Sequence, residues 1–302
     1  MANRGCPVCD SQKIFTVGPV LHPRPSHVAG VEIDLSGTTY WIRGCQECGF
    51  QFKDPPIDAE RLISCYEQAA SDKWETDPSP TTRQFDVLCD VVEKHAVGRR
   101  ILDVGCFNGA LLSYFGNDWQ RFGIEPSQAA AELAQSRGVH VLAPTLDEFN
   151  TGDSKFDVIV AIDVVEHIVD PLPFFHSIRE LLAPSGIFLI LTGDTDSLAW
   201  QMQSSFYWYC SLPEHVSFYS RRTLDWIGSQ LGLAGVEYQQ LCHKRLPLWW
   251  WCRDALKSGA YIVGRKAQGF GIPPLRRLFL ERRGPSIQSA RDHLIYVFQK
   301  MD

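Results

Sequence analysis

The sequence lacks several features that mark large classes of protein. It contains no run of about 18 consecutive uncharged apolar residues, the length that a membrane-spanning helix requires. Residues 1–10 do not show the charged-then-apolar order of a secretory signal. Internal repeats and low-complexity tracts are also missing. We therefore expect a globular, cytoplasmic protein, whose 45% hydrophobic residues suffice for a substantial core.

An overall excess of basic charge is missing too. The formal net charge of −6 argues against general nucleic-acid binding, and we expect no nucleic-acid partner. The charge is unevenly distributed, however, because residues 244–283 contain ten Lys and Arg against two acidic residues. This basic segment is therefore a separate functional candidate.

Four of the ten cysteines form two Cys-x-x-Cys pairs near the N-terminus, Cys6 with Cys9 and Cys45 with Cys48. Two such turns can present four thiolates to one tetrahedral Zn²⁺, which leaves no open position for water and predicts a structural zinc ion. A redox pair is the competing interpretation, but neither pair lies in a thioredoxin-like strand and helix. Alternating β-forming residues between the pairs predict a small zinc-ribbon module over residues 1–56.

From residue 99 onward, apolar strands alternate with amphipathic helices, which predicts an α/β, doubly wound sheet over 99–302. Residues 57–98 carry two predicted helices, 57–70 and 81–96, that connect the ribbon to this domain and cover a cofactor. The last two strands, with a long insertion between them, predict an antiparallel edge. The predicted strands are 101–104, 121–125, 139–142, 156–162, 186–192, 236–241 and 293–300. One helix is predicted to begin near residue 110, and the others span 127–136, 173–182 and 223–231.

A strand, a Gly-containing turn and a helix start at residues 101–112 predict a nucleotide-type cofactor site. The turn departs from the dinucleotide pattern Gly-x-Gly-x-x-Gly, because Asp103 precedes Gly105 by two and only Gly109 follows. An acid there suits a ligand that bears a cation and opposes a pyrophosphate. Glu125, at the end of the next strand, can accept hydrogen bonds from a ribose diol. The two carboxylates predict a nucleoside without phosphates.

These segments resemble the class I S-adenosylmethionine-dependent methyltransferases from about Thr81 onward. The resemblance rests on Asp103-Val-Gly-Cys-Phe-Asn-Gly109, Gly123-Ile-Glu-Pro-Ser127, Phe156-Asp-Val-Ile159, Asp163-Val-Val-Glu-His-Ile-Val-Asp-Pro171 and Leu181-Leu-Ala-Pro-Ser-Gly186. It implies a Rossmann-like, seven-stranded methyltransferase sheet with an antiparallel last strand. Phe107 departs from the family by replacing its usual middle glycine. The cofactor-binding residues that follow are Asp103, Gly105, Cys106, Phe107, Gly109, Glu125, Leu146, Asp147 and Asp163, with Leu146 and Asp147 near the adenine.

The two cysteine pairs resemble those of zinc-ribbon methyltransferases of saccharide and natural-product pathways. That likeness implies a small-molecule, saccharide-related or natural-product acceptor, with O-methylation favoured. C-methylation of a nucleotide-sugar and a catalytically silent S-adenosylmethionine-binding scaffold stay open as alternatives. A nicotinamide-dependent enzyme is disfavoured, because Asp103 stands where a pyrophosphate would bind.

The candidate catalytic residues are His167, its neighbour Glu166, and His215. A histidine just past the fourth strand could take the proton of an acceptor hydroxyl during methyl transfer. Glu166 and His167 could instead only hold the loop in place. Ubiquinone-pathway and small-RNA 3′-end methyltransferases resemble this pattern and use a divalent ion there, so Asp163, Glu166, His167 and His215 could hold Mg²⁺. Many relatives with this string of residues have no such metal.

The basic and aromatic insertion at about 245–290 begins with three tryptophans, Trp249 to Trp251. It could clamp an anionic acceptor, such as one linked to a nucleotide or lipid phosphate. It could also lie on an anionic membrane surface through residues 245–285, or form a homodimer contact. The fourth alternative is a packed helical subdomain with solvated charges.

Overall fold

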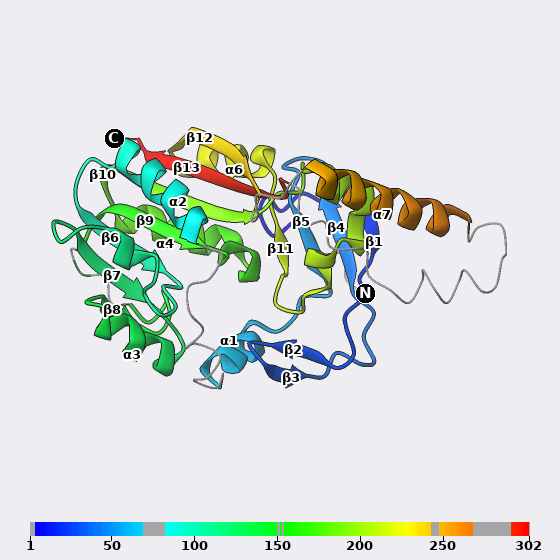
Figure 1. Ribbon diagram of the computed structural model, residues 1–302, viewed down its shortest axis with the longest axis horizontal. Helices are drawn as coiled ribbons and strands as arrows, with labels where there is room; N and C mark the ends of the chain where they lie inside the picture. Colours follow the sequence, from blue (N-terminus) through cyan, green and yellow to red (C-terminus); the bar gives the residue numbers. More distant parts are fainter. Residues whose placement is uncertain are drawn as a thin grey trace.

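The computed structural model describes residues 4–68, 82–149, 152, 154–242, 248–267 and 291–301. Its largest element is a seven-stranded sheet in the order β12-β13-β10-β9-β6-β7-β8 (Figure 1). The strands are β6 (Arg100–Val104), β7 (Gln120–Ile124), β8 (His140–Ala143), β9 (Phe156–Ile162), β10 (Leu182–Gly193), β12 (Leu233–Leu241) and β13 (His293–Lys300). All seven predicted strands are confirmed, with ends that shift by four residues at most.

The direction of one strand sets this sheet apart from a fully parallel one. Strands β8, β7, β6, β9 and β10 are parallel neighbours, whereas β13 is antiparallel to both β10 and β12. The predicted antiparallel edge, formed by the last two strands of the chain, is confirmed. The last strand of the chain lies between β10 and β12, so β12 forms the edge.

Helices cover both faces of the sheet, as the alternation of strand residues requires. Phe188 of β10 packs in a core cluster with residues of α4 (Pro171–Leu181) and α6 (Arg221–Leu231). The next residue, Leu189, belongs to a second cluster with residues of α2 (Thr82–His95) and α3 (Gln128–Ser136). The doubly wound architecture is therefore confirmed.

The helix predicted from residue 110 is replaced by a single 3₁₀ turn, η2 (Leu112–Tyr114). Asn108 favours a turn here, because its Oδ1 accepts a hydrogen bond from the Ala110 amide at 3.1 Å. Gly116 follows immediately after Phe115, and Asn117 and Asp118 continue the turn-forming sequence. The apolar residues between these two signals are too few for a longer helix.

The N-terminal part contains β1 (Ile14–Pro19), β2 (Ser26–Val28), β3 (Val31–Ile33), β4 (Trp41–Cys45), β5 (Gln51–Asp54) and α1 (Ala59–Glu67). Its main sheet has the order β1-β4-β5-β11, and β11 (Ser217–Phe218) comes from the methyltransferase-like part of the chain. Phe50 also packs against Tyr219, with ring centroids 5.3 Å apart. The predicted ribbon over 1–56 therefore shares a sheet and a core with the rest of the protein.

Three short elements between β10 and β11 escaped prediction, namely α5 (Leu198–Gln203), η4 (Ser204–Phe206) and η5 (Trp208–Ser211). The insertion forms one helix, α7 (Leu248–Ala267), which projects from the β1 and β4 side of the molecule in Figure 1. The other residues of the 245–290 insertion, and residues 69–81 of the predicted connection, lie outside the described ranges. Among the described helices, none is long and apolar enough to cross a membrane.

Candidate functional site

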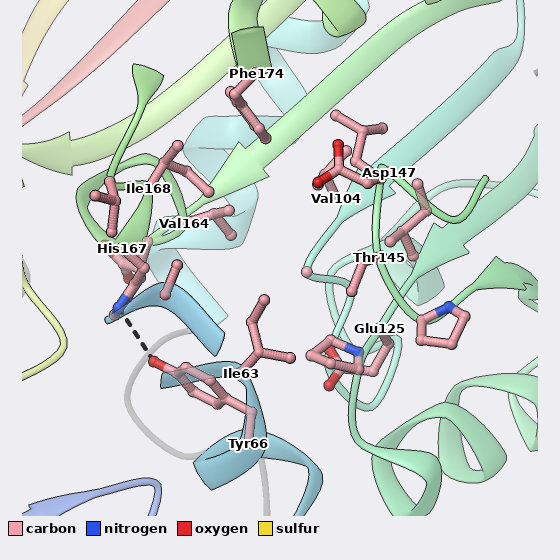
Figure 2. Close-up of a pocket in the computed structure, with 18 of the residues that line it drawn as sticks. Ile63, Tyr66, Val104, Glu125, Thr145, Asp147, Val164, His167, Ile168 and Phe174 are labelled. Carbon is pink, nitrogen blue, oxygen red and sulfur yellow. Dashed lines mark hydrogen bonds between the residues drawn. The ribbon is translucent and has the colours of Figure 1, made fainter. Parts of the chain in front are cut away.

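A cavity of about 610 Å³ opens at the carboxyl ends of β6, β7 and β9, where doubly wound sheets bind their ligands. One wall carries the turn after β6 and the segment after β8 (Figure 2). The opposite wall carries the loop after β9 and helix α1. Of the predicted site residues, those in its lining are Gly105, Phe107, Glu125, Leu146, Asp147, Asp163 and His167.

The turn after β6 is folded by its own backbone. The amides of Gly105 and Cys106 both donate to the Ile124 carbonyl, at 2.8 and 3.0 Å. Gly105 has φ +76°, and a Cβ at this position would lie 2.7 Å from Cγ2 of Val164. A glycine is therefore required here, because any side chain would combine backbone strain with a clash.

Glu125 is held in place by two main-chain amides. Its Oε2 accepts a hydrogen bond from the Phe107 amide and its Oε1 accepts one from the Ser127 amide, both at 2.9 Å. Burial raises the pKa of Glu125, while these two hydrogen bonds oppose the rise. Each carboxylate oxygen can accept a further hydrogen bond, so the group can still bind a diol in the cavity.

Three residues expected to touch the ligand are absent from the cavity lining. Asp103 is buried below the turn, and its Oδ1 has no hydrogen-bond partner among the described residues. Burial, and after it the charge of Glu125, raises the pKa of Asp103 well above its usual value. Cys106 packs in the core with Val139, and Gly109 lies against Ala134. These residues lie behind the turn, and a contact of theirs with the ligand stays a prediction.

Asp163 lines the cavity at the end of β9. It has φ +52°, a conformation that few residues other than glycine adopt. The protein atoms around the carboxyl group, and after them the charge of Glu166, raise the pKa of Asp163, although its side chain is accessible from the cavity.

His167 lies on the opposite wall from Glu125, in η3 (Val165–His167). Its Nδ1 is 3.1 Å from the hydroxyl of Tyr66, which reaches it from α1 (Figure 2). The ring of His215 stands behind it, with centroids 5.0 Å apart and planes at 81°. The structure thus brings the two predicted histidines together, although His215 itself does not line the cavity.

His215 is buried, and its Nδ1 has no hydrogen-bond partner among the described residues. Burial lowers the pKa of His215 well below its usual value, and the neighbouring His167 lowers it further. The ring is therefore neutral at physiological pH. Tyr209 packs closely against it, with ring centroids 3.9 Å apart.

Glu166 is fully buried and has both carboxylate oxygens occupied. The Tyr209 hydroxyl donates to Oε1 at 2.6 Å, and the Thr192 hydroxyl donates to Oε2 at 2.9 Å. Glu166 is absent from the cavity lining. Its geometry corresponds to the alternative in which it holds the loop, rather than to a direct catalytic role.

Lys53 is a functional neighbour that the sequence analysis missed. Only 1% of this β5 residue is exposed, and its Nζ donates to the carbonyls of Leu212 and Pro213 at 2.5 and 3.3 Å. Burial lowers the pKa of Lys53 to about 7. Phe52 and Lys53 are adjacent in β5 and both buried, so the usual alternation of strand residues gives no signal for Lys53. Its hydrogen bonds hold the turn that precedes His215.

Strand β11 connects the ribbon sheet to the histidine loop. On one side, the Lys53 amide donates to the Val216 carbonyl at 2.9 Å. On the other side, the Val216 amide donates to the Glu166 carbonyl at 2.8 Å, and the Ser217 hydroxyl donates to the Ile168 carbonyl at 2.5 Å. The loop that carries His167 is thus bonded, through one short strand, to the N-terminal part of the chain.

The four cysteines of the two Cys-x-x-Cys pairs converge. The Sγ atoms of Cys6 and Cys48 are 3.6 Å apart, those of Cys9 and Cys45 are 3.5 Å apart, and all four lie within 4.8 Å of one another. Tetrahedral zinc with Zn–S bonds of about 2.3 Å places its sulfurs about 3.8 Å apart. The cluster therefore has the size and the donor set of a Cys₄ zinc site.

The fold and the cavity are those of a Rossmann-like methyltransferase, and comparison with known proteins agrees. Residues 81–238, just over half of the chain, match the family described as methyltransferase domain. The chain therefore belongs to the methyltransferase-domain family.

Two curated relatives are each named ubiquinone biosynthesis O-methyltransferase. The one from Erwinia tasmaniensis is 28% identical over 153 residues, which cover 46% of this chain and 63% of the relative. The one from Azorhizobium caulinodans is 36% identical over 104 residues, which cover 32% of this chain and 40% of the relative. The match thus spans less than two thirds of either relative.

Among solved structures, the N-methyltransferase NodS from Bradyrhizobium japonicum in complex with S-adenosylhomocysteine is similar, with a TM-score of 0.51 and 18% identity. The match covers 82% of this chain and all of NodS. A phosphoethanolamine N-methyltransferase from Haemonchus contortus has a TM-score of 0.54 and 16% identity, with 83% and 63% coverage. At these identities the likeness establishes the fold.

Proposed function

We propose that this protein is an S-adenosylmethionine-dependent methyltransferase that methylates a hydroxyl group of a small-molecule acceptor. The observation that carries the proposal is one cavity with two different walls. The first wall presents a glycine turn and the carboxylate of Glu125, and the second presents His167 with its Nδ1 at the Tyr66 hydroxyl. A nucleoside methyl donor and a hydroxyl acceptor need these two kinds of wall.

The first wall suits the methyl donor. Glu125 would accept hydrogen bonds from the ribose diol, and Gly105 would let the methionine part approach the backbone. Leu146 and Asp147 line the same side and would flank the adenine. Asp163 would contact the donor from the end of β9. Membership in the methyltransferase-domain family supports this assignment.

The second wall would supply the base. The acceptor oxygen forms a bond to the methyl carbon of the sulfonium while the carbon–sulfur bond breaks, which leaves S-adenosylhomocysteine. The acceptor proton passes to Nε2 of His167. For this role the proton of neutral His167 sits on Nδ1 and is donated to the Tyr66 oxygen. Burial, and then the charge of Glu214, raises the pKa of Tyr66, so the phenol stays protonated.

The acceptor is proposed by class only. The names of the curated relatives support O-methylation in ubiquinone-type biosynthesis. The saccharide-related acceptor rests on the resemblance of the two cysteine pairs alone. An acceptor with a hydroxyl group is compatible with both classes, the ubiquinone-type and the saccharide-related one. In either case His167 would take the proton of that hydroxyl group.

We further propose that Cys6, Cys9, Cys45 and Cys48 hold a structural Zn²⁺. The sulfur positions fit a tetrahedral ion, and four thiolates leave no site for a substrate. In α6, Arg222 donates to the Gln46 carbonyl at 2.9 Å, which ties the second pair to the methyltransferase part. Zinc would therefore stabilise the N-terminal sheet and, through β11, the loop of His167.

A divalent ion at the histidines receives less support. Donor atoms of Glu166, His167 and His215 lie within 4.8 Å of one another, but Asp163 is outside this group. Both oxygens of Glu166 already accept hydrogen bonds from hydroxyl groups. Because the set does not fit the four-residue Mg²⁺ site expected from the sequence, no step of the proposed reaction uses the ion.

The test combines binding with methyl transfer. Calorimetry should detect binding of S-adenosylhomocysteine, and mass spectrometry should detect transfer of a labelled methyl group to a catechol or to a monosaccharide hydroxyl. Absence of S-adenosylhomocysteine binding would refute the cofactor assignment. Binding without transfer to these acceptors or to a nucleotide-sugar would favour the scaffold alternative, and a methyl group on a sugar carbon would favour C-methylation.

Metal analysis tests the zinc site independently. The purified protein should contain about one zinc per chain, and Cys45→Ser should lose it because three thiolates bind the ion more weakly. Cys89→Ser is the matched control, since Cys89 lies in α2, away from the cluster. Zinc retained in full by Cys45→Ser would contradict the proposed ligand set.

A further inference from the structure

Helix α7 has a buried side and a side that carries exposed apolar residues. Its buried side carries Asp254, Ser258 and Tyr261, which recur at the spacing of one helix face. Ser258 accepts a hydrogen bond from the Gln203 amide group at 3.5 Å, and Arg253 pairs with Asp254 at 2.8 Å. The hydrogen bond from Gln203 links α7 to α5, whereas the Arg253–Asp254 pair lies within α7 itself.

The side of α7 that faces solvent is apolar. Leu256 is 75% exposed, Val263 is 67% exposed, and Trp249 is 60% exposed. These residues are seven positions apart and, with Ala260, form one continuous face, which we call the outer stripe. Figure 1 shows α7 projecting from the body, so the stripe can be reached from outside. An apolar face turned to water indicates a binding surface, because its burial elsewhere would be favourable.

Basic residues flank the outer stripe. By the 100° step of a helix, Arg253 and Lys257 fall along one side of the stripe. Lys257 is exposed. The sequence from residue 244 to 283 has ten basic and two acidic residues, in a chain whose net charge is −6. An apolar stripe beside basic residues, with an aromatic residue at one end, is the composition of a helix that lies in a membrane interface.

We propose that α7 is a reversible anchor that docks its outer stripe on an anionic phospholipid surface. Apolar side chains would enter the acyl boundary while the flanking cations meet the lipid phosphates. A second copy of this chain fits less well. It would bring two strongly basic segments together, and a narrow stripe is far smaller than the roughly 800 Å² per partner of a stable interface. The inference does not depend on the proposed reaction.

Vesicle flotation with the full-length protein tests this inference. Phosphatidylcholine vesicles that contain phosphatidylglycerol should carry the protein, whereas pure phosphatidylcholine vesicles should leave it in solution. Added salt should release it, because screening weakens the attraction between the basic residues and the lipid. Calorimetry with S-adenosylhomocysteine runs in parallel and checks the cofactor site without vesicles.

Three variants sharpen the experiment. Val263→Asp should weaken vesicle partitioning by about tenfold or more, since it places a charge in the stripe. Lys257→Glu should weaken it by about tenfold on the anionic vesicles, because it reverses a flanking charge. Val97→Asp is the matched control, because Val97 is 57% exposed but follows α2, which lies at the opposite end of the molecule from α7 in Figure 1. It should partition as the unmodified protein does.

Either of two results would overturn the proposal. Equal partitioning on both vesicle types would exclude recognition of anionic lipid. Unchanged partitioning of Val263→Asp and Lys257→Glu would place the contact elsewhere. If the protein instead ignores vesicles and elutes as a dimer that Val263→Asp dissociates, the outer stripe binds a second copy and not a membrane.

Discussion

The two walls of the cavity are built in different ways. The donor wall comes from one stretch, residues 104–147, in which consecutive strand ends place Gly105 and Glu125, and main-chain amides hold the Glu125 carboxylate. The acceptor wall combines distant segments: Tyr66 from α1, His167 from η3, and His215 behind it. Side-chain contacts join these three residues, and main-chain hydrogen bonds to the segment at Val216 hold the loop of His167.

This difference predicts which substitutions affect the donor wall and which affect the acceptor wall. Register between parallel strands and two backbone hydrogen bonds keep the donor wall in place, so it should tolerate changes elsewhere in the protein. The acceptor wall depends on β5 and β11, which join the N-terminal sheet to the His167 loop. Substitutions that disrupt the pairing of β5 with β11 should therefore lower the rate of methyl transfer without weakening donor binding.

The largest effect is expected at the acceptor wall for His167→Gln. Loss of a general base typically costs about 10² to 10⁴ in rate, so kcat should fall by roughly a hundredfold or more. The dissociation constant for S-adenosylhomocysteine should not change, because the donor wall is intact. Steady-state kinetics and calorimetry measure the two quantities. His27→Gln, at an exposed position of β2, is the control, and a similar loss there would exclude a specific role for His167.

Glu125→Ala should produce the reverse pattern at the donor wall. A hydrogen bond to a charged group contributes about 1.5–3 kcal/mol, so the affinity for S-adenosylhomocysteine should fall by about tenfold to a hundredfold. Glu132→Ala, on the exposed side of α3, provides the control in the same calorimetric experiment. Unchanged affinity in Glu125→Ala would remove Glu125 from the donor site.

The sequence predicts the donor wall far better than the acceptor wall. Apolar runs and glycines mark strands and turns locally, so β6, β9 and the turn at Gly105 could be located without any structure. Parallel strand ends then meet at one sheet edge, which brings Glu125 and Asp163 to one cavity. What the sequence leaves open in this wall is which way the side chains of Asp103, near the end of β6, and Cys106, in the following turn, point.

The acceptor wall depends on contacts between residues that are far apart in the sequence. No local sequence pattern predicts such contacts. Nothing in the sequence near Tyr66 indicates that its hydroxyl meets His167, 101 positions away. Likewise, β11 is only two residues long, and its neighbour in the sheet comes from the N-terminal part. Such contacts arise from packing of the whole molecule, whereas motifs report on adjacent residues.

Lys53 allows a test of how the N-terminal sheet supports this wall. The folded protein lowers its pKa from the model-peptide value of 10.5 to about 7, chiefly through burial. Below about pH 7 Lys53 carries its proton in both the folded and the unfolded state. The folded state is then destabilised by the full cost of burying the charged lysine. Between about pH 7 and pH 10.5 the unfolded state binds more protons, so stability must rise with pH.

Urea unfolding at several pH values should show this rise. The contribution of Lys53 corresponds to roughly 2 kcal/mol of added stability between about pH 7 and pH 9. Lys53→Met should remove it, since methionine does not titrate. Lys155→Met is the matched control, because Lys155 is exposed and also donates to a backbone carbonyl, that of Glu180. Identical pH profiles for the unmodified protein and Lys53→Met would show that Lys53 titrates normally.

Tyr66→Phe is expected to give the smallest effect and the most specific one. The substitution keeps the ring that packs edge-on against His167, with centroids 5.9 Å apart, and removes only the hydroxyl. Without that oxygen Nδ1 loses its hydrogen-bond partner, and His167 can adopt either tautomer. We expect kcat to fall by about tenfold, the value of one hydrogen bond of about 1 kcal/mol or slightly more, with KM and donor affinity unchanged.

A loss of packing could also lower kcat, so the measurement must report on the proton itself. Nitrogen NMR of the histidine ring distinguishes the two neutral tautomers, and the Nδ1–H form of His167 should dominate only when the Tyr66 hydroxyl is present. Tyr114→Phe, at a half-exposed position in η2, should alter neither the tautomer nor the rate. If Tyr66→Phe slows methyl transfer but leaves the tautomer ratio as it was, Tyr66 supports the acceptor wall by packing. If the ratio shifts with the rate, the helix outside the family's matched region sets the protonation of the base.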